Sequence, residues 1–148
     1  MSLDDAANAA RGPDGNLGYL FRVAYQNFRR RLESALAGHG LTVPEYSALS
    51  AFDAQPQMSS AELARLLDVT PQTMNTLVHE LLGRSLLSRE RRPSQGKTLL
   101  LRLSPRGRRL LDTATEAVRS VEATSLNERG AREQRAIKTW LSDLARAT

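Results

Sequence analysis

Polar side chains that could read a pattern of hydrogen-bonding groups gather just after Thr70-Pro71. Gln72 and Asn75 carry amides, which donate and accept hydrogen bonds together and therefore suit the edge of an adenine. Thr76 beside them can reach a base edge or a phosphate group. A threonine followed by proline is a typical helix start, because the hydroxyl caps the helix and proline at the first position needs no N–H partner. These groups are therefore predicted near the N-terminus of a helix, where helices that enter the DNA major groove make base contacts.

Residues 84–109 form a strongly basic segment. It contains nine basic residues and one acid, Glu90, for a net charge of +8, whereas the other residues sum to −3 within the total of +5. A solvated surface usually mixes both signs, so this partition predicts a polyanionic partner, with an ordinary solvated face as the alternative. The basic residues are Arg84, Arg89, Arg91, Arg92, Lys97, Arg102, Arg106, Arg108 and Arg109.

The elements around these residues follow the order of a winged helix-turn-helix. Residues 59–62 are a capping box, S-x-x-E, that opens a short helix, and Thr70 soon starts the next one. Residues 86–89 and 98–103 then read as two strands separated by turn residues 93–96. The hairpin places its cations beside the exposed helix, so the two elements could contact adjacent parts of a duplex. The buried stripe of that helix is predicted at Met74, Leu77, Val78, Leu81 and Leu82.

Longer helices are predicted on both sides of this lobe. An apolar face runs from Leu17 to Ala35, Thr42 opens another helix through a capping box with Glu45, and Ser104-Pro105 starts a long helix. Gly130 separates a last helix. The first and last helices carry apolar residues that a winged core need not absorb, which predicts a homodimer. The predicted dimer-interface residues are Leu17, Phe21, Phe28, Ile137, Trp140, Leu141 and Leu144, with a ligand-lining role as the alternative for Trp140.

The predicted fold class is mainly α (α+β), a winged helix-turn-helix with N- and C-terminal dimerisation helices. Residues 41–104 form the winged helix-turn-helix DNA-binding lobe, and residues 15–40 and 105–148 form the dimerisation helices. Residues 1–14 are small and polar with a Gly-Pro break, so we expect a flexible arm that is disordered or loosely docked.

Composition argues against several other classes of protein. The chain has no cysteine, which excludes disulfides and thiolate metal sites, and its two histidines leave little for a metal, so no metal and no cofactor are expected. An enzyme is disfavoured because the sequence lacks H-E-x-x-H, a phosphate-binding glycine loop and a histidine near a Ser-Asp pair. With no run of about 18 apolar residues and no signal peptide, the chain is expected in the cytoplasm, without a membrane partner.

Double-stranded DNA is therefore the predicted partner. A winged-helix module for protein interaction or RNA binding is the alternative, but it would not need the polar helix face and the cationic hairpin together. His79 is expected at the rim of the helix, in contact with a phosphate or water. The predicted DNA-binding residues are Ser60, Thr70, Gln72, Thr73, Asn75, Thr76, His79, Arg84, Arg89, Arg91, Arg92 and Lys97.

About three quarters of the chain resembles the MarR family of bacterial regulators. The specific matches are Leu41-Thr42 followed by Tyr46 and Leu49, the run Glu62-Leu63-Ala64, and Leu86-Leu87-Ser88-Arg89 leading through the hairpin to Leu103-Ser104-Pro105-Arg106-Gly107. The resemblance implies a homodimer with intertwined first and last helices, acting as a repressor on a pseudo-palindromic operator. It also implies release of the operator when a small phenolic or other aromatic acid binds.

Two positions depart from the family pattern. The hairpin tip from Arg92 to Leu99 lacks the usual acidic, Arg-rich sequence, so Arg91, Arg92 and Lys97 remain as candidates for the cation that enters the minor groove. Ser85 stands where the family tends to have glycine, so the helix before it should end through Gly83 or a strained turn. If an effector exists, its pocket is expected between the first two helices and the DNA-binding lobe, near Tyr25, Arg29, Tyr46 and Phe52.

Overall fold

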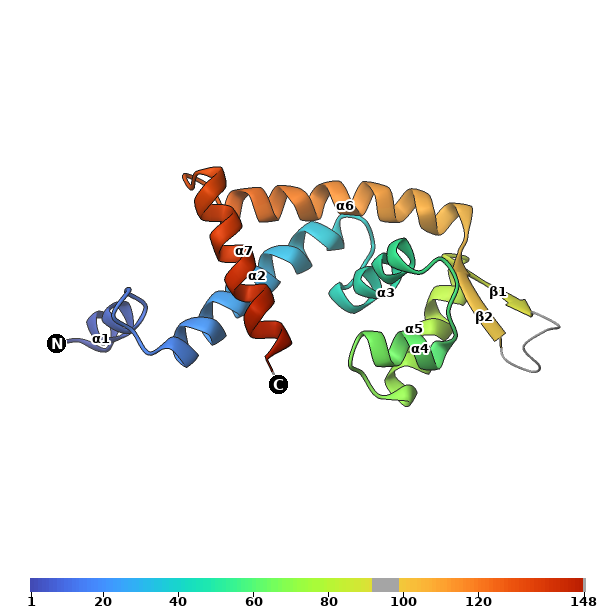
Figure 1. Cartoon of the computed structure of the whole chain (residues 1–148), viewed down its shortest axis with the longest axis horizontal. Coiled ribbons are helices and arrows are strands. Elements are labelled where there is room, and N and C mark those ends of the chain that lie inside the picture. The colour runs from blue at the N-terminus through green and yellow to red at the C-terminus, as the bar shows by residue number, and fades with distance from the viewer. Residues whose placement is uncertain (92–98, 148) are drawn as a thin grey trace.

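The computed structural model describes residues 1–91 and 99–147, and this part contains seven helices and one two-stranded sheet (Figure 1). The predicted mainly α fold with a β-hairpin is confirmed. In chain order the elements are α1 (Leu3–Ala10), α2 (Leu17–Ala37), α3 (Val43–Ala54), α4 (Ser60–Leu66), α5 (Pro71–Gly83), β1 (Leu87–Arg91), β2 (Leu99–Leu103), α6 (Pro105–Ser125) and α7 (Ala131–Arg146).

Hydroxyl caps fix the starts of the helices in the winged lobe. Thr42 Oγ1 accepts the backbone N–H of Glu45, and Glu45 Oε2 accepts the N–H of Thr42 at 2.8 Å, which completes the predicted capping box of α3. Ser59 and Glu62 make the same reciprocal pair at α4. Thr70 caps α5 before Pro71, as predicted. Each cap contributes about 1 kcal/mol, so the sequence sets these boundaries locally.

One apolar cluster holds α3, α4, α5 and the hairpin against α6. The stripe of α5 supplies Met74, Val78 and Leu81 to it, as predicted from their helical spacing. Replacing one such side chain with alanine costs about 2–5 kcal/mol, so this cluster dominates the stability of the lobe. Its most enclosed large members are Leu36, Leu49, Phe52, Met58, Leu63, Met74, Leu81, Leu86 and Leu111.

The hairpin β1–β2, hereafter the wing, is antiparallel, with Leu87 opposite Leu103 and Arg91 opposite Leu99. Met58 extends the sheet by a bridge to Leu101, through hydrogen bonds of 3.2 and 2.8 Å between their backbones. The base of the wing is therefore fastened to the segment that precedes α4. The predicted turn 93–96 lies outside the described residues.

The junction of α5 and β1 contains the strained turn that was one of the two expected outcomes. Ser85 has a φ of 58°, the left-handed region that favours glycine, whereas Gly83 belongs to the helix. The Oγ of Ser104 donates a 2.6 Å hydrogen bond to the Ser85 carbonyl oxygen. This bond connects the strained turn to the start of α6.

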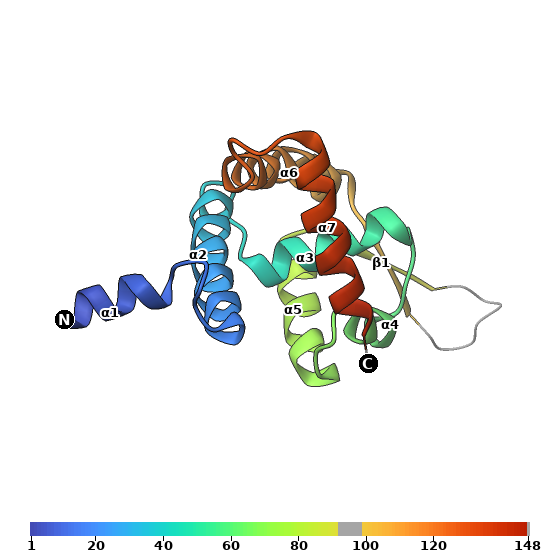
Figure 2. The same cartoon turned by 60° about the vertical axis from the view of Figure 1, so that its left-hand side comes forward.

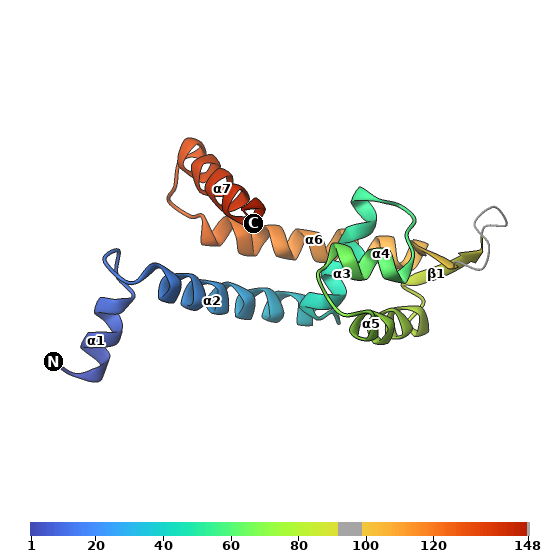
Figure 3. The same ribbon diagram turned by 60° about the horizontal axis from the view of Figure 1, so that its bottom comes forward.

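Three long helices stand on the other side of the lobe (Figures 1 and 3). α2 and α6 pack along each other, and α7 turns back after Gly130 so that it crosses α2. At this crossing the rings of Phe21 and Trp140 stack with their centroids 5.4 Å apart. Trp140 nevertheless remains 48% exposed, which leaves one side of the indole available to another surface.

Helix α1 departs from the prediction for residues 1–14, which did not include a helix. Ser2 accepts the N–H of Asp5, and Asp5 accepts the N–H of Ser2, both at 3.1 Å, so a capping box opens α1. The same contact lowers the pKa of the Asp5 carboxyl. The small and polar residues with a Gly-Pro break predict a flexible arm, although alanine, which is frequent among them, is the strongest helix former. None of its side chains is buried, and Figures 1–3 show α1 standing clear of the other helices.

Candidate nucleic-acid interface

Helix α5 presents one polar face to solvent and one apolar face to the core. Met74, Val78 and Leu81 are buried, which leaves the opposite side of the helix free at the lower edge of the lobe in Figure 2. The predicted amphipathic pattern is confirmed. The exposed polar residues, hereafter the α5 face, are Gln72, Thr73, Asn75, Thr76 and His79.

Two hydroxyl groups at the start of α5 already donate hydrogen bonds within the chain. Thr70 Oγ1 donates to Thr73 Oγ1 at 2.9 Å, and Thr76 Oγ1 donates to the Gln72 carbonyl at 3.2 Å. The Thr70 and Thr76 hydroxyls can only accept a further bond, and the Thr73 hydroxyl, which accepts from Thr70, keeps one hydrogen to donate, whereas an amide both donates and accepts. The amides of Gln72 and Asn75 are therefore the groups best suited to read base edges.

A shallow depression of about 300 Å³ joins the α5 face to the wing. We call it the notch. Its rim combines a hydroxyl, an amide, an imidazole and a guanidinium, and Ser60 Oγ donates a 2.9 Å hydrogen bond to Asn75 Oδ1 across it. Three apolar side chains form its floor, and sequence reasoning missed them because only the folded hairpin brings strand β2 beside α5. The lining residues are Ser60, Asn75, Val78, His79, Arg89, Leu99 and Leu101.

Arg89 and Arg91 of the wing are exposed cations that form no ion pair with any described residue. Segment 92–98 contains no acidic residue, so it offers no carboxylate to either one. Unpaired guanidinium groups are the side chains that neutralise phosphates most effectively. The predicted contacts Arg92 and Lys97 lie outside the described residues and stay predictions.

Other cations of the basic segment are held by acids of the same chain. The Arg102 guanidinium lies 3.3 Å from Glu90, and Arg108 lies 2.6 Å from Asp53 and 3.5 Å from Asp112. The hydrogen bond that Arg108 donates to Asp53 raises the pKa of Arg108 above its already high value. The segment is thus less uniform than its +8 net charge suggests, because the charges of Arg102 and Arg108 are paired within the chain.

Arg84 was predicted to contact DNA, but the structure gives its guanidinium partners inside the protein. One nitrogen lies 3.3 Å from Glu45 Oε2, and another donates to the Gly40 carbonyl at 2.8 Å. Arg84 follows the C-terminal end of α5, whereas Gln72 lies in its first turn. The structure therefore favours a role for Arg84 in joining α5 to the start of α3.

The predicted dimer residues lie on α2 and α7 and are only partly covered within the single chain. Leu17 is 59% exposed, and Leu144 is 49% exposed, with Leu141 close behind at 44%. Phe21, Phe28 and Ile137 are half-buried. Large apolar side chains that stay this accessible are typical of a protein interface.

Two of the four residues predicted to line an effector pocket, Arg29 and Phe52, line separate depressions. Arg29 lies on α2, ion-paired with Glu33 at 2.9 Å in a depression lined only by α2 residues. Contacts with Glu33 and Tyr25 raise the Arg29 pKa. Phe52 lies in the core and lines a different depression beside the start of α6. Tyr46 is half-buried, with its hydroxyl 3.4 Å from that of Thr115 on α6.

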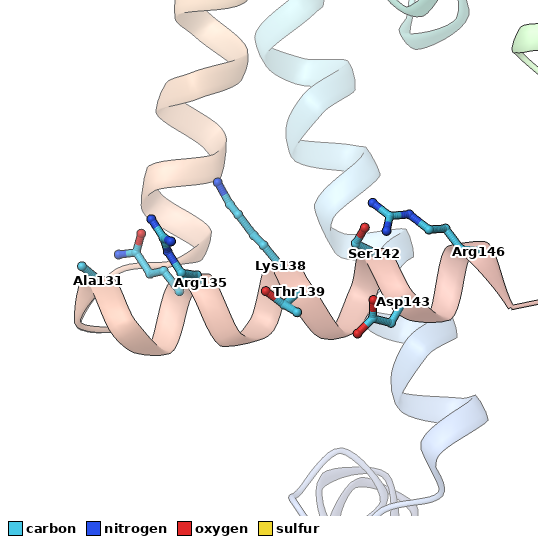
Figure 4. Close-up of a pocket in the computed structure, with 8 residues that line it drawn as sticks. Ala131, Arg135, Lys138, Thr139, Ser142, Asp143 and Arg146 are labelled. Carbon is cyan, nitrogen blue, oxygen red and sulfur yellow. The ribbon is translucent and has the colours of Figure 1, made fainter.

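A further depression, of about 510 Å³, follows the outer side of α7 (Figure 4). Its labelled side chains Arg135, Lys138 and Arg146 are long and charged, and they project from one helix. This chemistry differs from the aromatic lining expected for an effector, and the depression lies away from the α5 face. Within the described residues, no group of three or more His, Asp or Glu could hold a metal ion. No helix of the described part combines the length and the apolar character needed to cross a lipid bilayer.

Comparison with known proteins places this geometry in a family. The model of the MarR family matches residues 39–97, which span the start of the lobe to the wing. The HTH-type transcriptional repressor Rv2887 of Mycobacterium tuberculosis is 38% identical over 131 residues, which cover 88% of this chain and 94% of that protein.

Solved structures agree with the sequence comparison. The Rv2887 complex with DNA superposes with a TM-score of 0.74 at 37% identity and covers 88% of this chain and 98% of that one. Its complex with salicylic acid gives a TM-score of 0.71 at 38% identity, with coverage of 89% and 98%. The apo form of MarR from E. coli, at 18% identity, TM-score 0.74 and coverage of 87% and 96%, shows the shared fold. The chain belongs to the MarR family of winged helix-turn-helix transcriptional regulators.

Proposed function

We propose that this protein is a transcriptional repressor that binds a pseudo-palindromic operator in duplex DNA as a homodimer. Each protomer inserts α5 into the major groove, where Gln72 and Asn75 contact base edges. The wing follows the adjacent backbone, where Arg89 and Arg91 contact phosphates. The dimer acts in the cytoplasm, where its operator lies.

The observation that carries this proposal is that the polar α5 face and the basic wing adjoin each other in one lobe. The α5 face is exposed over its first turns, and Arg89, which has no ion pair with a described residue, lines the same notch as Asn75 and His79. A helix that reads base edges needs the first surface, and a protein that neutralises phosphates needs the second. The relative Rv2887, which has been crystallised with DNA, supports the same partner.

A homodimer explains why the operator should have two half-sites. The apolar residues of α2 and α7 are the surface through which two copies would associate, and a two-fold axis would then repeat α5. Two such helices enter successive major grooves when they lie about 34–36 Å apart. The half-sites are thus expected one helical turn apart, centre to centre.

The proposal is tested by substitutions that separate base contacts from phosphate contacts. Asn75→Ala should lower the preference for operator over random duplex by about 1–3 kcal/mol, because it removes a base contact. Arg91→Ala should instead weaken binding to every duplex alike, and it should flatten the plot of log affinity against log salt by about one unit per protomer. Fluorescence anisotropy over a series of salt concentrations measures both effects.

A matched control is Arg119→Ala, which removes the same charge from the exposed side of α6, where Arg119 pairs with Glu116. This variant should bind like the parent. If Asn75→Ala and Arg91→Ala also bound operator and random duplex as the parent does, the proposed contacts would be wrong.

We also propose that a small aromatic acid releases the operator. Rv2887 has been crystallised with salicylic acid and with p-aminosalicylic acid, which supports this class of ligand. In this chain Arg29 offers a guanidinium for the carboxylate, in exchange for Glu33, and Tyr25 lies beside it as a ring for stacking.

Salicylate is the probe for this part of the proposal. Added to the protein–operator complex, it should lower the anisotropy in the parent and in Arg119→Ala, whereas Arg29→Ala should need a higher concentration for the same release. No release at millimolar salicylate, or an equal response in Arg29→Ala, would contradict the assignment.

A further inference from the structure

One hydrogen bond ties the two helices of the helix-turn-helix to each other at the α5 face. Ser60 Oγ, on the first residue of α4, donates to Asn75 Oδ1 of α5 at 2.9 Å. The backbone that carries this hydroxyl is held by the capping box of α4. The neighbouring Ser59 accepts the N–H of Glu62, and the Glu62 carboxylate accepts the N–H of Ser59 at 2.7 Å. The donor is therefore presented to Asn75 from a rigid helix start.

This bond determines how the Asn75 amide lies before DNA arrives. The terminal torsion of an asparagine has a broad, roughly two-fold energy profile, so an exposed amide without partners turns between orientations. A donor on Oδ1 selects one of them. The Nδ2 group keeps both hydrogens for acceptors on a base, and Oδ1 keeps a second lone pair for a base amino group.

Gln72 offers a comparison within the same helix. Its side-chain amide has no hydrogen-bond partner among residues 1–91 and 99–147, and it is exposed in the first turn of α5. The threonine hydroxyls of α5 are directed to one another or to the helix backbone. Among the described residues, the Asn75 amide therefore has a hydrogen-bond partner, and the Gln72 amide has none.

We propose that Ser60 is a positioning residue for base recognition. It orients the Asn75 amide and thereby sets the base preference at the single base pair that Asn75 reads, where a purine N7 or another major-groove acceptor meets Nδ2. The sequence predicts Ser60 as a direct DNA contact, whereas the hydrogen bond to Asn75 points to this different role. The inference rests on the proposed function, since it presupposes that α5 reads a duplex.

The test is a double-mutant cycle on operator duplexes in which each base pair is changed in turn. Ser60→Ala removes the donor and leaves the Ser59 cap of α4 intact, so the lobe should fold normally, which thermal unfolding checks. It should lower discrimination at the base pair affected by Asn75→Ala by about three- to tenfold, the range expected when one side chain must be ordered on binding. The base pair read by Gln72 should keep its preference.

Two further variants distinguish positioning from direct contact. Ser60→Ala combined with Asn75→Ala should discriminate no worse than Asn75→Ala alone, because the hydroxyl then has nothing to orient. Ser60→Thr retains the hydroxyl and should restore the parent preference. Thr113→Ala, which removes an exposed hydroxyl from α6, should have no effect.

Other outcomes would overturn the inference. Equal weakening on every duplex, with losses that add in the double variant, would make Ser60 a direct phosphate contact. Unchanged base preference in Ser60→Ala would leave it without a role in recognition. A parent protein that binds all duplexes equally would instead contradict the proposed function itself, so the two failures are distinguishable.

Discussion

The residues of the interface fall into two groups: those proposed to contact DNA, and those that stabilise the lobe. Arg89 and Arg91 form no ion pair with a described residue, since Glu90 between them pairs with Arg102, whereas Arg84 is bound by Glu45 and Gly40. The sequence predicted the amides of α5 correctly as an exposed face, since helical spacing determines it. It could not separate Arg84 from the other cations, because the carbonyl that binds it lies 44 residues away in the chain.

Arg84→Ala should therefore act on stability and leave the salt dependence of DNA binding unchanged. The Glu45 carboxylate is almost buried, and the loss of its partner should lower the free energy of unfolding by about 1–3 kcal/mol. Urea denaturation measures this loss. Arg119→Ala, which breaks an exposed pair, should change stability by less than about 1 kcal/mol. A flatter salt slope with parental stability would restore Arg84 to the DNA contacts.

At the scale of elements, local signals set the helix starts, and long-range contacts set the rest. The caps at Thr42, Ser59 and Thr70 were visible as sequence patterns because their partners lie three residues away. Helix α1 was missed although Ser2 and Asp5 form a related box, since small and polar residues with a Gly-Pro break indicate a flexible arm. The notch was also missed, because its strand and helix residues meet only in the folded lobe.

Two glycines differ in whether a neighbouring element lies close to them. A Cβ on Gly107 would lie 2.0 Å from the Leu86 carbonyl oxygen, so Gly107→Ala should separate α6 from the wing and cost about 1–3 kcal/mol or more. A Cβ on Gly83 would meet nothing within 4 Å, and Gly83→Ala should stabilise α5 by about 0.5–1 kcal/mol. Thermal unfolding of both variants checks the contrast. Equal effects of the two substitutions would contradict the packing described for α6.

At the scale of the whole molecule, the long helices and the winged lobe have different surfaces. The lobe encloses its core, whereas α2 and α7 leave apolar side chains accessible. The sequence predicted these apolar faces from their spacing. It did not predict that Phe21 and Trp140 stack within one chain, because the return of α7 across α2 depends on the turn before Gly130. The assignment of residues 41–104 to DNA binding, and of residues 15–40 and 105–148 to dimerisation, stays a prediction.

The dimer should depend on the indole of Trp140. Trp140→Ala removes a large, half-accessible apolar surface and should weaken self-association at least tenfold, since aromatic anchors dominate interface energies. Thr139→Ala on the polar side of the same helix should associate like the parent. Sedimentation equilibrium at micromolar concentrations measures both, and a Trp140→Ala protein that remained fully dimeric would place the interface elsewhere.

The reading of two half-sites by two copies of α5 is tested most directly by a hydroxyl-radical footprint. The protein is bound to a fragment that it selects from genomic DNA, and to a random duplex of equal length at the same concentration. We predict two protected windows on the selected fragment, centred about 10–10.5 base pairs apart, and no such windows on the random duplex. A single window, or equal protection of both duplexes, would contradict the account.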